Sequence, residues 1–199
     1  MAEALSSDAA LQPAPGEDQY CSLALANSLM TLTGGRVVDR LATPEGANEW
    51  LAEHDLTPAD LGLRESCATQ LRVLREHVRA LLASRADGLS APLAAVTALN
   101  QAMTSVPTSP LLQWDEKTGP YRVTTHPTAA AVDFAIAHLA ANAADLLTGP
   151  DADRLTACGS TPCSRFLLRR GRRHWCSTRC GDRARAARAY ARRTDPEAN

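Results

Sequence analysis

The sequence predicts a mainly α-helical protein, in which a helical N-terminal domain with one β-hairpin is followed by a small four-cysteine module that ends in a helix. Apolar residues recur at helical spacing through most of residues 19–149, and one pair of β-prone runs flanks a turn. Four of the six cysteines lie between residues 158 and 180. The 199 residues have room for one domain with its own core and a small appendage, which we place at 154–194.

The N-terminal half contains three segments with helical character. Residues 20–32 are almost entirely apolar before a double glycine, and this length favours a buried helix, although a strand at the start of the segment also fits. The Thr-Pro-Glu sequence at 43–45 supplies an N-cap residue, a first-turn proline and an acid near the helix dipole, so a short helix begins there. A similar start at 57–60 leads into a long helix over 65–86.

The second half changes from helix to hairpin and back to helix. The spacing predicts a helix over 92–103. Two short β-prone runs, at 111–114 and 121–124, flank a polar turn and predict the hairpin. The alanine-rich stretch 127–147 returns to helical spacing, and the Gly-Pro pair at 149–150 ends it and marks the domain boundary.

Charge is divided unevenly along the chain. Residues 154–193 contain twelve arginines and one acid, a net charge of +11, whereas residues 1–153 contain nine basic and nineteen acidic residues, a net charge of −10. Because phosphates are neutralised by cations gathered on one surface, this division favours attraction of nucleic acid to the C-terminal module. A solvated, charged helix face is the alternative reading of the same residues.

The hydropathy of the chain bears on its location. No segment offers about 18 uncharged apolar residues, and residues 1–18, which we expect to be disordered, are acidic and contain prolines, unlike a signal peptide. We therefore expect a cytoplasmic protein with reduced thiols and no membrane partner.

The four clustered cysteines, Cys158, Cys163, Cys176 and Cys180, form two close pairs separated by twelve residues. Both thiolates of a close pair can reach one ion at ~2.3 Å, and the intervening arch allows the second pair to complete a tetrahedron. In a reducing compartment such pairs bind metal more readily than they form disulfides, so we predict that these four residues bind Zn²⁺. His174 is the alternative ligand, although four thiolates already complete the shell.

Other residues near the cysteines have structural roles in this interpretation. Phe166, Leu167 and Trp175 are expected to form a small apolar cluster behind the metal, in preference to stacking on bases. The two remaining cysteines, Cys21 and Cys67, lie in apolar helical patterns and are expected to be small buried side chains.

Arginines of the module are the candidate nucleic-acid contacts. Those around Gly171 occupy a loop suited to phosphates, whereas those after Cys180 lie on an alanine–arginine helix. At the start of that helix, Arg183 and Arg185 are placed to read base edges in a major groove. The complete candidate set is Arg169, Arg170, Arg172, Arg173, Arg183, Arg185, Arg188 and Arg192.

The stretch from Trp175 to Arg183, WCSTRCGDR, resembles the Trp-Cys-Ser…Cys-Gly-Asn-Arg signature of CGNR zinc fingers. The upstream cysteine pair, Phe166 and the arginine-rich end of the chain also fit this family. One departure is Asp182, which stands where the signature has Asn. Both residue types cap helices, but an acid is a poorer neighbour for a phosphate.

The preceding residues resemble the ABATE domain that usually precedes this finger. The resemblance lies in residues 23–32, in the step from 41–44 to Trp50-Leu51, and in the helix around 71–75. The resemblance implies a largely helical domain with a β-hairpin, and a protein that acts as a stress-induced transcription regulator. It names no ligand.

The function expected from these features is that of a zinc-stabilised, DNA-binding transcription regulator whose acidic N-terminal domain senses a signal or forms a homodimer. A finger that binds RNA or an acidic protein surface and a thiol-based redox switch remain alternatives. An enzyme is the least favoured class, because a four-thiolate shell leaves no open position and no catalytic motif is present. Asn27, in an apolar segment, is expected to form buried hydrogen bonds rather than bind a ligand.

Overall fold

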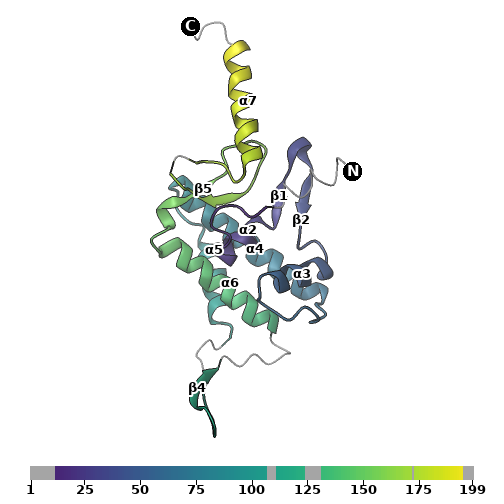
Figure 1. The fold of residues 1–199 in the computed structure, drawn as a ribbon, viewed down its shortest axis with the longest axis vertical. Helices are drawn as coiled ribbons and strands as arrows, with labels where there is room; N and C mark the ends of the chain where they lie inside the picture. The colour runs from purple at the N-terminus through teal and green to yellow at the C-terminus, as the bar shows by residue number, and fades with distance from the viewer. Residues whose placement is uncertain (1–11, 107–110, 124–130, 172, 195–199) are drawn as a thin grey trace.

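The structure is a computed structural model that describes residues 12–106, 111–123, 131–171 and 173–194. Helices form a central body, from which helix α7 projects at one end and the β3–β4 hairpin at the other (Figure 1). The predicted mainly α class is confirmed. The helices are α2 (Cys21–Asn27), α3 (Pro44–Glu53), α4 (Glu65–Asp87), α5 (Leu93–Thr104), α6 (Ala131–Thr148) and α7 (Thr178–Thr194). The strands are β1 (Leu29–Thr31), β2 (Val37–Asp39), β3 (Leu111–Asp115), β4 (Gly119–Val123), β5 (Leu155–Ala157) and β6 (Phe166–Leu168), with short 3₁₀ turns η1 (Thr33–Gly35) and η3 (Ala152–Arg154).

The main core lies where α2, α4 and α6 meet, with α3 and α5 packed at its sides. Leucines on α2, α4 and α6 are fully buried, and Trp50 and Leu51 of α3 join them. Strands β5 and β6 belong to the same core through Leu155, Phe166 and Leu168. The division of the chain at 149–150 stays a prediction about sequence organisation, since the apolar core is continuous across it.

Helix α3 begins as predicted. The Thr43 Oγ1 accepts a hydrogen bond from the Gly46 N–H at 3.1 Å, and Pro44 occupies the first turn. The long helix predicted over 65–86 is confirmed as α4, but the start predicted at 57–60 is wrong, because these residues form no helix and, among the described residues, no side chain caps α4. Tertiary packing of the buried α4 face outweighs that local signal.

The helix predicted over 20–32 is shorter than expected. Helix α2 ends at Asn27, and the residues after Ser28 form β1, which pairs antiparallel with β2. The physical reason is hydrogen bonding: the Ser28 hydroxyl donates to the Leu25 carbonyl, and the Asn27 side chain bonds the backbone of β6. The two glycines of η1, both with φ near +78°, then form the turn between the strands.

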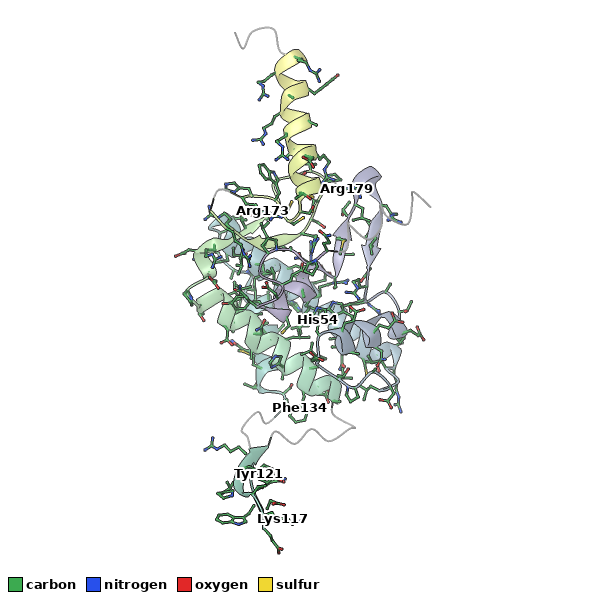
Figure 2. The ribbon with its side chains drawn as sticks, in the orientation of Figure 1. His54, Lys117, Tyr121, Phe134, Arg173 and Arg179 are labelled. Atoms are coloured by element: carbon green, nitrogen blue, oxygen red, sulfur yellow. The ribbon has the colours of Figure 1, made fainter. Side chains whose placement is uncertain are left out.

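The predicted hairpin is present as β3 and β4, in antiparallel register from Leu111 opposite Val123 to Asp115 opposite Gly119. The Asp115 carboxylate stabilises the turn by accepting from the N–H groups of Lys117 and Thr118, each at 2.9 Å. Figure 2 shows this hairpin beyond the end of the body. The first residues of the helix predicted at 127–147 lie outside the described residues, and α6 is described from Ala131.

Residues 12–18, which the sequence analysis assigns to a disordered N-terminus, are instead packed against the finger. Ala14 is buried beside the cysteines, and the carbonyl of Pro15 accepts from the Leu168 N–H at 2.8 Å. Close approach explains a glycine here: a Cβ on Gly16, whose φ is +100°, would lie 2.6 Å from Leu168 Cγ. Local polarity predicted disorder, but contacts with a strand distant in sequence order these residues.

Candidate metal centre and basic helix

Four cysteine sulfurs meet between the β5–β6 hairpin and the start of α7. Cys158 follows β5, Cys163 lies in the loop before β6, Cys176 precedes α7 and Cys180 lies in its first turn. The four Sγ atoms all lie within 4.8 Å of one another. The Sγ of Cys176 is 3.7 Å from that of Cys163 and 3.6 Å from that of Cys180.

These separations fit a tetrahedral zinc site. Sulfurs bound at ~2.3 Å to one tetrahedral ion lie about 3.8 Å apart, close to the distances observed. Four thiolates form a closed shell, which is the structural rather than the catalytic form of a zinc site. Within the described ranges, this cluster contains no histidine or carboxylate: His174 is exposed, and its carbonyl accepts from the Gly159 N–H at 3.0 Å. The cofactor that these cysteines suit is Zn²⁺.

Backbone hydrogen bonds hold the cysteines in place. The Cys158 N–H donates to the Arg165 carbonyl and the Cys163 N–H to the Ser160 carbonyl, both at 2.8 Å, which closes the first turn. The Cys176 N–H points at the Cys158 sulfur at 3.5 Å. On the helix side, the Ser177 hydroxyl accepts from the Cys180 N–H at 3.2 Å. Each cysteine pair is therefore positioned by its own turn.

The pKa values of the neighbouring thiols indicate that a bound cation would stabilise the cluster. Hydrogen bonds from Cys163 and Cys176 lower the pKa of the Cys158 thiol, and the same bonds raise the pKa of the Cys163 and Cys176 thiols. Neighbouring thiols thus share one negative charge instead of ionising together. A divalent cation removes this conflict, because it favours every thiolate at once.

Apolar side chains support the metal centre from one side. Leu167 is fully buried against three of the cysteines and Ala14, and Trp175 packs at the edge of this cluster. The prediction for these two residues is confirmed. For Phe166 it is wrong, because Phe166 belongs to the main core. Successive residues of a strand point to opposite faces, so Phe166 and Leu167 pack against different clusters.

A buried polar network joins the finger to the body. The Asn27 side chain accepts from the Phe166 N–H at 2.8 Å and donates to the Phe166 carbonyl at 2.9 Å and to Glu17 Oε1 at 2.6 Å. Arg165, which is 4% exposed, also donates to Glu17, at 2.8 Å. Burial lowers the pKa of Arg165, but the Glu17 carboxylate more than offsets this, so the net shift is upward. The predicted hydrogen-bonding role of Asn27 is confirmed.

Arg79 of α4 is a second link that sequence reasoning missed. Its guanidinium donates to the Ala26 carbonyl at 2.5 Å and to the Ser164 carbonyl at 3.2 Å, and it lies 5.5 Å from the centre of the Phe166 ring. Burial lowers its pKa. No local signal identifies such a residue, because its partners are far away in the sequence.

Helix α7 carries arginines away from the body (Figure 1). Arg185 and Arg188 lie over the Trp175 ring, at 5.8 and 5.6 Å from its centre, and Arg185 also pairs with Asp182 at 2.5 Å. Arg192, one turn further along, is exposed. These three arginines share one side of the helix, as their spacing predicts.

Arg183 is placed differently from its neighbours. It is partly buried and donates to Ser160 Oγ at 3.1 Å, to the Ser160 carbonyl at 2.9 Å and to the Cys180 sulfur at 3.4 Å. Its guanidinium therefore supports a thiolate of the metal centre. A side chain that reads bases must instead point away from the protein, which Arg183 does not do. A chain position at a helix start could not reveal this.

The remaining candidate arginines lie in the loop before Trp175. Arg169 donates to the Asp153 carbonyl at 2.9 Å, and Arg173 donates to the Trp175 carbonyl at 3.0 Å, while Arg170 is 3.9 Å from Asp18. All three are exposed. Arg172 lies outside the described residues. Figure 2 shows the side chains of Arg173 and Arg179 near the base of α7. Arg179, which was not among the candidates, is therefore a further arginine beside this loop.

The other two cysteines are half-buried, less than expected. Burial raises the pKa of the Cys21 thiol, which favours its protonated, less reactive form.

No helix in the described part of the chain combines the length and apolarity that crossing a bilayer requires.

Two known families match successive parts of the chain. Residues 21–150 match the ABATE family, described as "Putative stress-induced transcription regulator", and residues 154–193 match the CGNR zinc finger. No curated protein matches the chain. Because the first match alone covers well over half of the sequence, and the four cysteines of the second converge, the chain belongs to the ABATE family and is a zinc-finger regulatory protein with a CGNR finger.

Proposed function

We propose that the protein is a DNA-binding transcription regulator, in which a zinc ion held by Cys158, Cys163, Cys176 and Cys180 anchors α7 for insertion into DNA. The observation that carries this proposal is the placement of α7. Its 17 residues project from the body, and its only acid is Asp182, near its start. At 1.5 Å per residue the helix extends about 25 Å, enough to lie along a major groove.

The base of α7 supports such an approach. Trp175 lies beneath Arg185 and Arg188 and restrains their guanidinium groups, which reduces the entropy lost when they bind an anion. Arg169, Arg170 and Arg173 lie on the adjacent loop and extend the basic surface towards a second phosphate row. Arg185 is the proposed base reader, while Arg183 supports the metal centre.

The charge of the body gives the complex its direction. Residues 1–153 carry a net charge of −10, so DNA is repelled by the body and attracted by the finger. The protein therefore approaches DNA with the α7 end first. The body is then free to receive a signal or a second copy of the chain.

Titration of fluorescent DNA duplexes at several salt concentrations tests the proposal. With the wild-type protein, the logarithm of affinity should fall linearly with that of salt, by about 0.9 units per phosphate contact. Arg185→Ala, Arg188→Ala and Arg192→Ala combined should flatten this slope by about three units. Selection of bound genomic fragments then supplies the target sequence, on which Arg185→Ala alone should reduce discrimination by ~1–3 kcal/mol.

A matched control separates local contacts from total charge. Arg36→Ala, Arg64→Ala and Arg122→Ala remove the same charge from exposed positions outside the finger and should leave the slope unchanged. Equal losses in both triple variants would contradict the proposal. Salt-independent binding, or tighter binding of RNA than of any selected duplex, would reassign the finger to another partner.

A further inference from the structure

A cavity of about 320 Å³ lies between α4, α5 and α6, lined by residues that do not belong to the cysteines' own apolar cluster. Its walls are mainly apolar. The lining includes Leu81, Arg85, Val96, Leu99 and Ala144. This volume is at the lower end of the range for small-molecule sites in proteins.

Helix α5 leaves this cavity incompletely filled. Only Ala95 and Leu99 of the helix are buried, whereas Leu93 is 80% exposed and Val96 is 37% exposed. Leu89, in the turn before α5, is also exposed and lines the same cavity. An apolar molecule that binds here would remove this apolar surface from contact with water, which favours binding.

Arg85 gives the cavity its polarity. It is the one charged side chain in the described lining, and it pairs with Asp153. The Asp153 side chain is 90% exposed, so water screens this ion pair and the pair is weak. A carboxylate presented from inside the cavity would meet Arg85 in a less solvated setting and could form a bidentate pair.

We propose that this cavity binds a small apolar carboxylic acid, with the hydrocarbon part between α5 and α6 and the carboxylate on Arg85. The family description assigns no ligand, and this site does not depend on the DNA-binding proposal. Asp153, the group displaced from Arg85, belongs to the turn that leads directly into β5 of the finger. The ligand would therefore bind beside the entry to the finger.

The test uses 4-phenylbutyrate and its alcohol, 4-phenyl-1-butanol, as probes of the full-length zinc-loaded protein in isothermal titration calorimetry. The carboxylate should bind with a negative heat-capacity change and more tightly than the alcohol. Arg85→Gln should weaken the carboxylate by about tenfold and leave the alcohol unchanged, since only the charge-assisted pair is lost. Equal affinities of the two probes, or no effect of Arg85→Gln, would overturn the carboxylate assignment.

Two filling variants locate the site. Ala144→Phe should abolish binding of both probes, and Val96→Trp, at a more exposed position, serves if the first variant does not fold. The control is Ala98→Phe, which fills a second cavity of about 350 Å³ on α5, lined by Leu74 and Ile136. It should leave binding intact. The ligand proposal is wrong if neither probe binds to the wild-type protein. It is also wrong if the filling variants change the oligomeric state of the protein but still bind the probes.

Discussion

The two apolar clusters of this protein are stabilised in different ways. The main core gathers leucines and alanines from most of the described helices and from both strands of the β5–β6 hairpin. The second cluster consists of Ala14, Leu167 and three of the cysteines, with the fourth cysteine and Trp175 at its edge. Burial alone can stabilise the first, whereas the second is too small to offset the entropy of ordering its chain and requires a metal. The border between them runs through β6.

The largest expected effect is that of metal removal. Apparent zinc affinities of ~10–16 kcal/mol in such sites are also folding free energy, so a chelator or Cys176→Ser should unfold the two turns that carry the cysteines and α7. Strands β5 and β6 should stay protected, because Leu155, Phe166 and Leu168 pack in the main core. Hydrogen exchange measures both regions in one experiment. Simultaneous loss of protection in α4 and α7 would show that the two clusters form one cooperative unit.

Adjacent residues of β6 sharpen the comparison. Phe166→Ala should destabilise the body by about 3–5 kcal/mol, and Leu167→Ala should instead weaken zinc binding, with little change in the midpoint of body unfolding. Urea unfolding followed by circular dichroism and zinc competition with a chromophoric chelator give the two readouts. If both substitutions lower both quantities equally, the alternation along β6 does not separate the clusters.

The polar link between the clusters has an intermediate expected effect. Asn27→Ala leaves the N–H and carbonyl of Phe166 without their present partners and should cost about 1–3 kcal/mol in unfolding free energy. Ser22→Ala in the same helix is the control, since the buried Ser22 hydroxyl has no hydrogen-bond partner among the described residues and should be replaceable at no loss. A smaller effect of Asn27→Ala than of its control would contradict this role.

The smallest expected effect is the loss of stability at low pH through Asp39. Burial raises the pKa of Asp39, but hydrogen bonds from Arg75 and the Leu41 N–H outweigh it, so the folded-state pKa is below its usual value. The ionised group therefore stabilises the fold above its unfolded pKa of about 3.9, and this contribution is lost as pH falls through the folded value. In urea titrations from pH 6 to pH 2, Asp39→Asn should be destabilised at pH 6 and converge on the wild type in acid. Parallel profiles would contradict the assignment.

Local signals predicted much of the fold correctly. The Thr-Pro-Glu start of α3, the helical spacing of α4, α5 and α6 and the β3–β4 turn depend on neighbouring residues and are visible in any window of the sequence. The spacing of the cysteines likewise indicated a four-sulfur site, because metal geometry limits the spacing that can work. Counting charges identified the basic module, because a net charge can be read from the sequence without knowledge of any contact.

Contacts distant in sequence produced the corrections at α2, at residues 12–18 and at Arg183. Asn27 ends α2 because its amide pairs with β6, residues 12–18 are ordered because they pack on the finger, and Arg183 turns to Ser160 and Cys180. In each case one residue could satisfy its hydrogen bonds or apolar surface in several ways, and its own neighbourhood does not choose among them. That choice depends on which partners the folded chain brings within a few ångströms, because hydrogen bonding and close packing act only at short range.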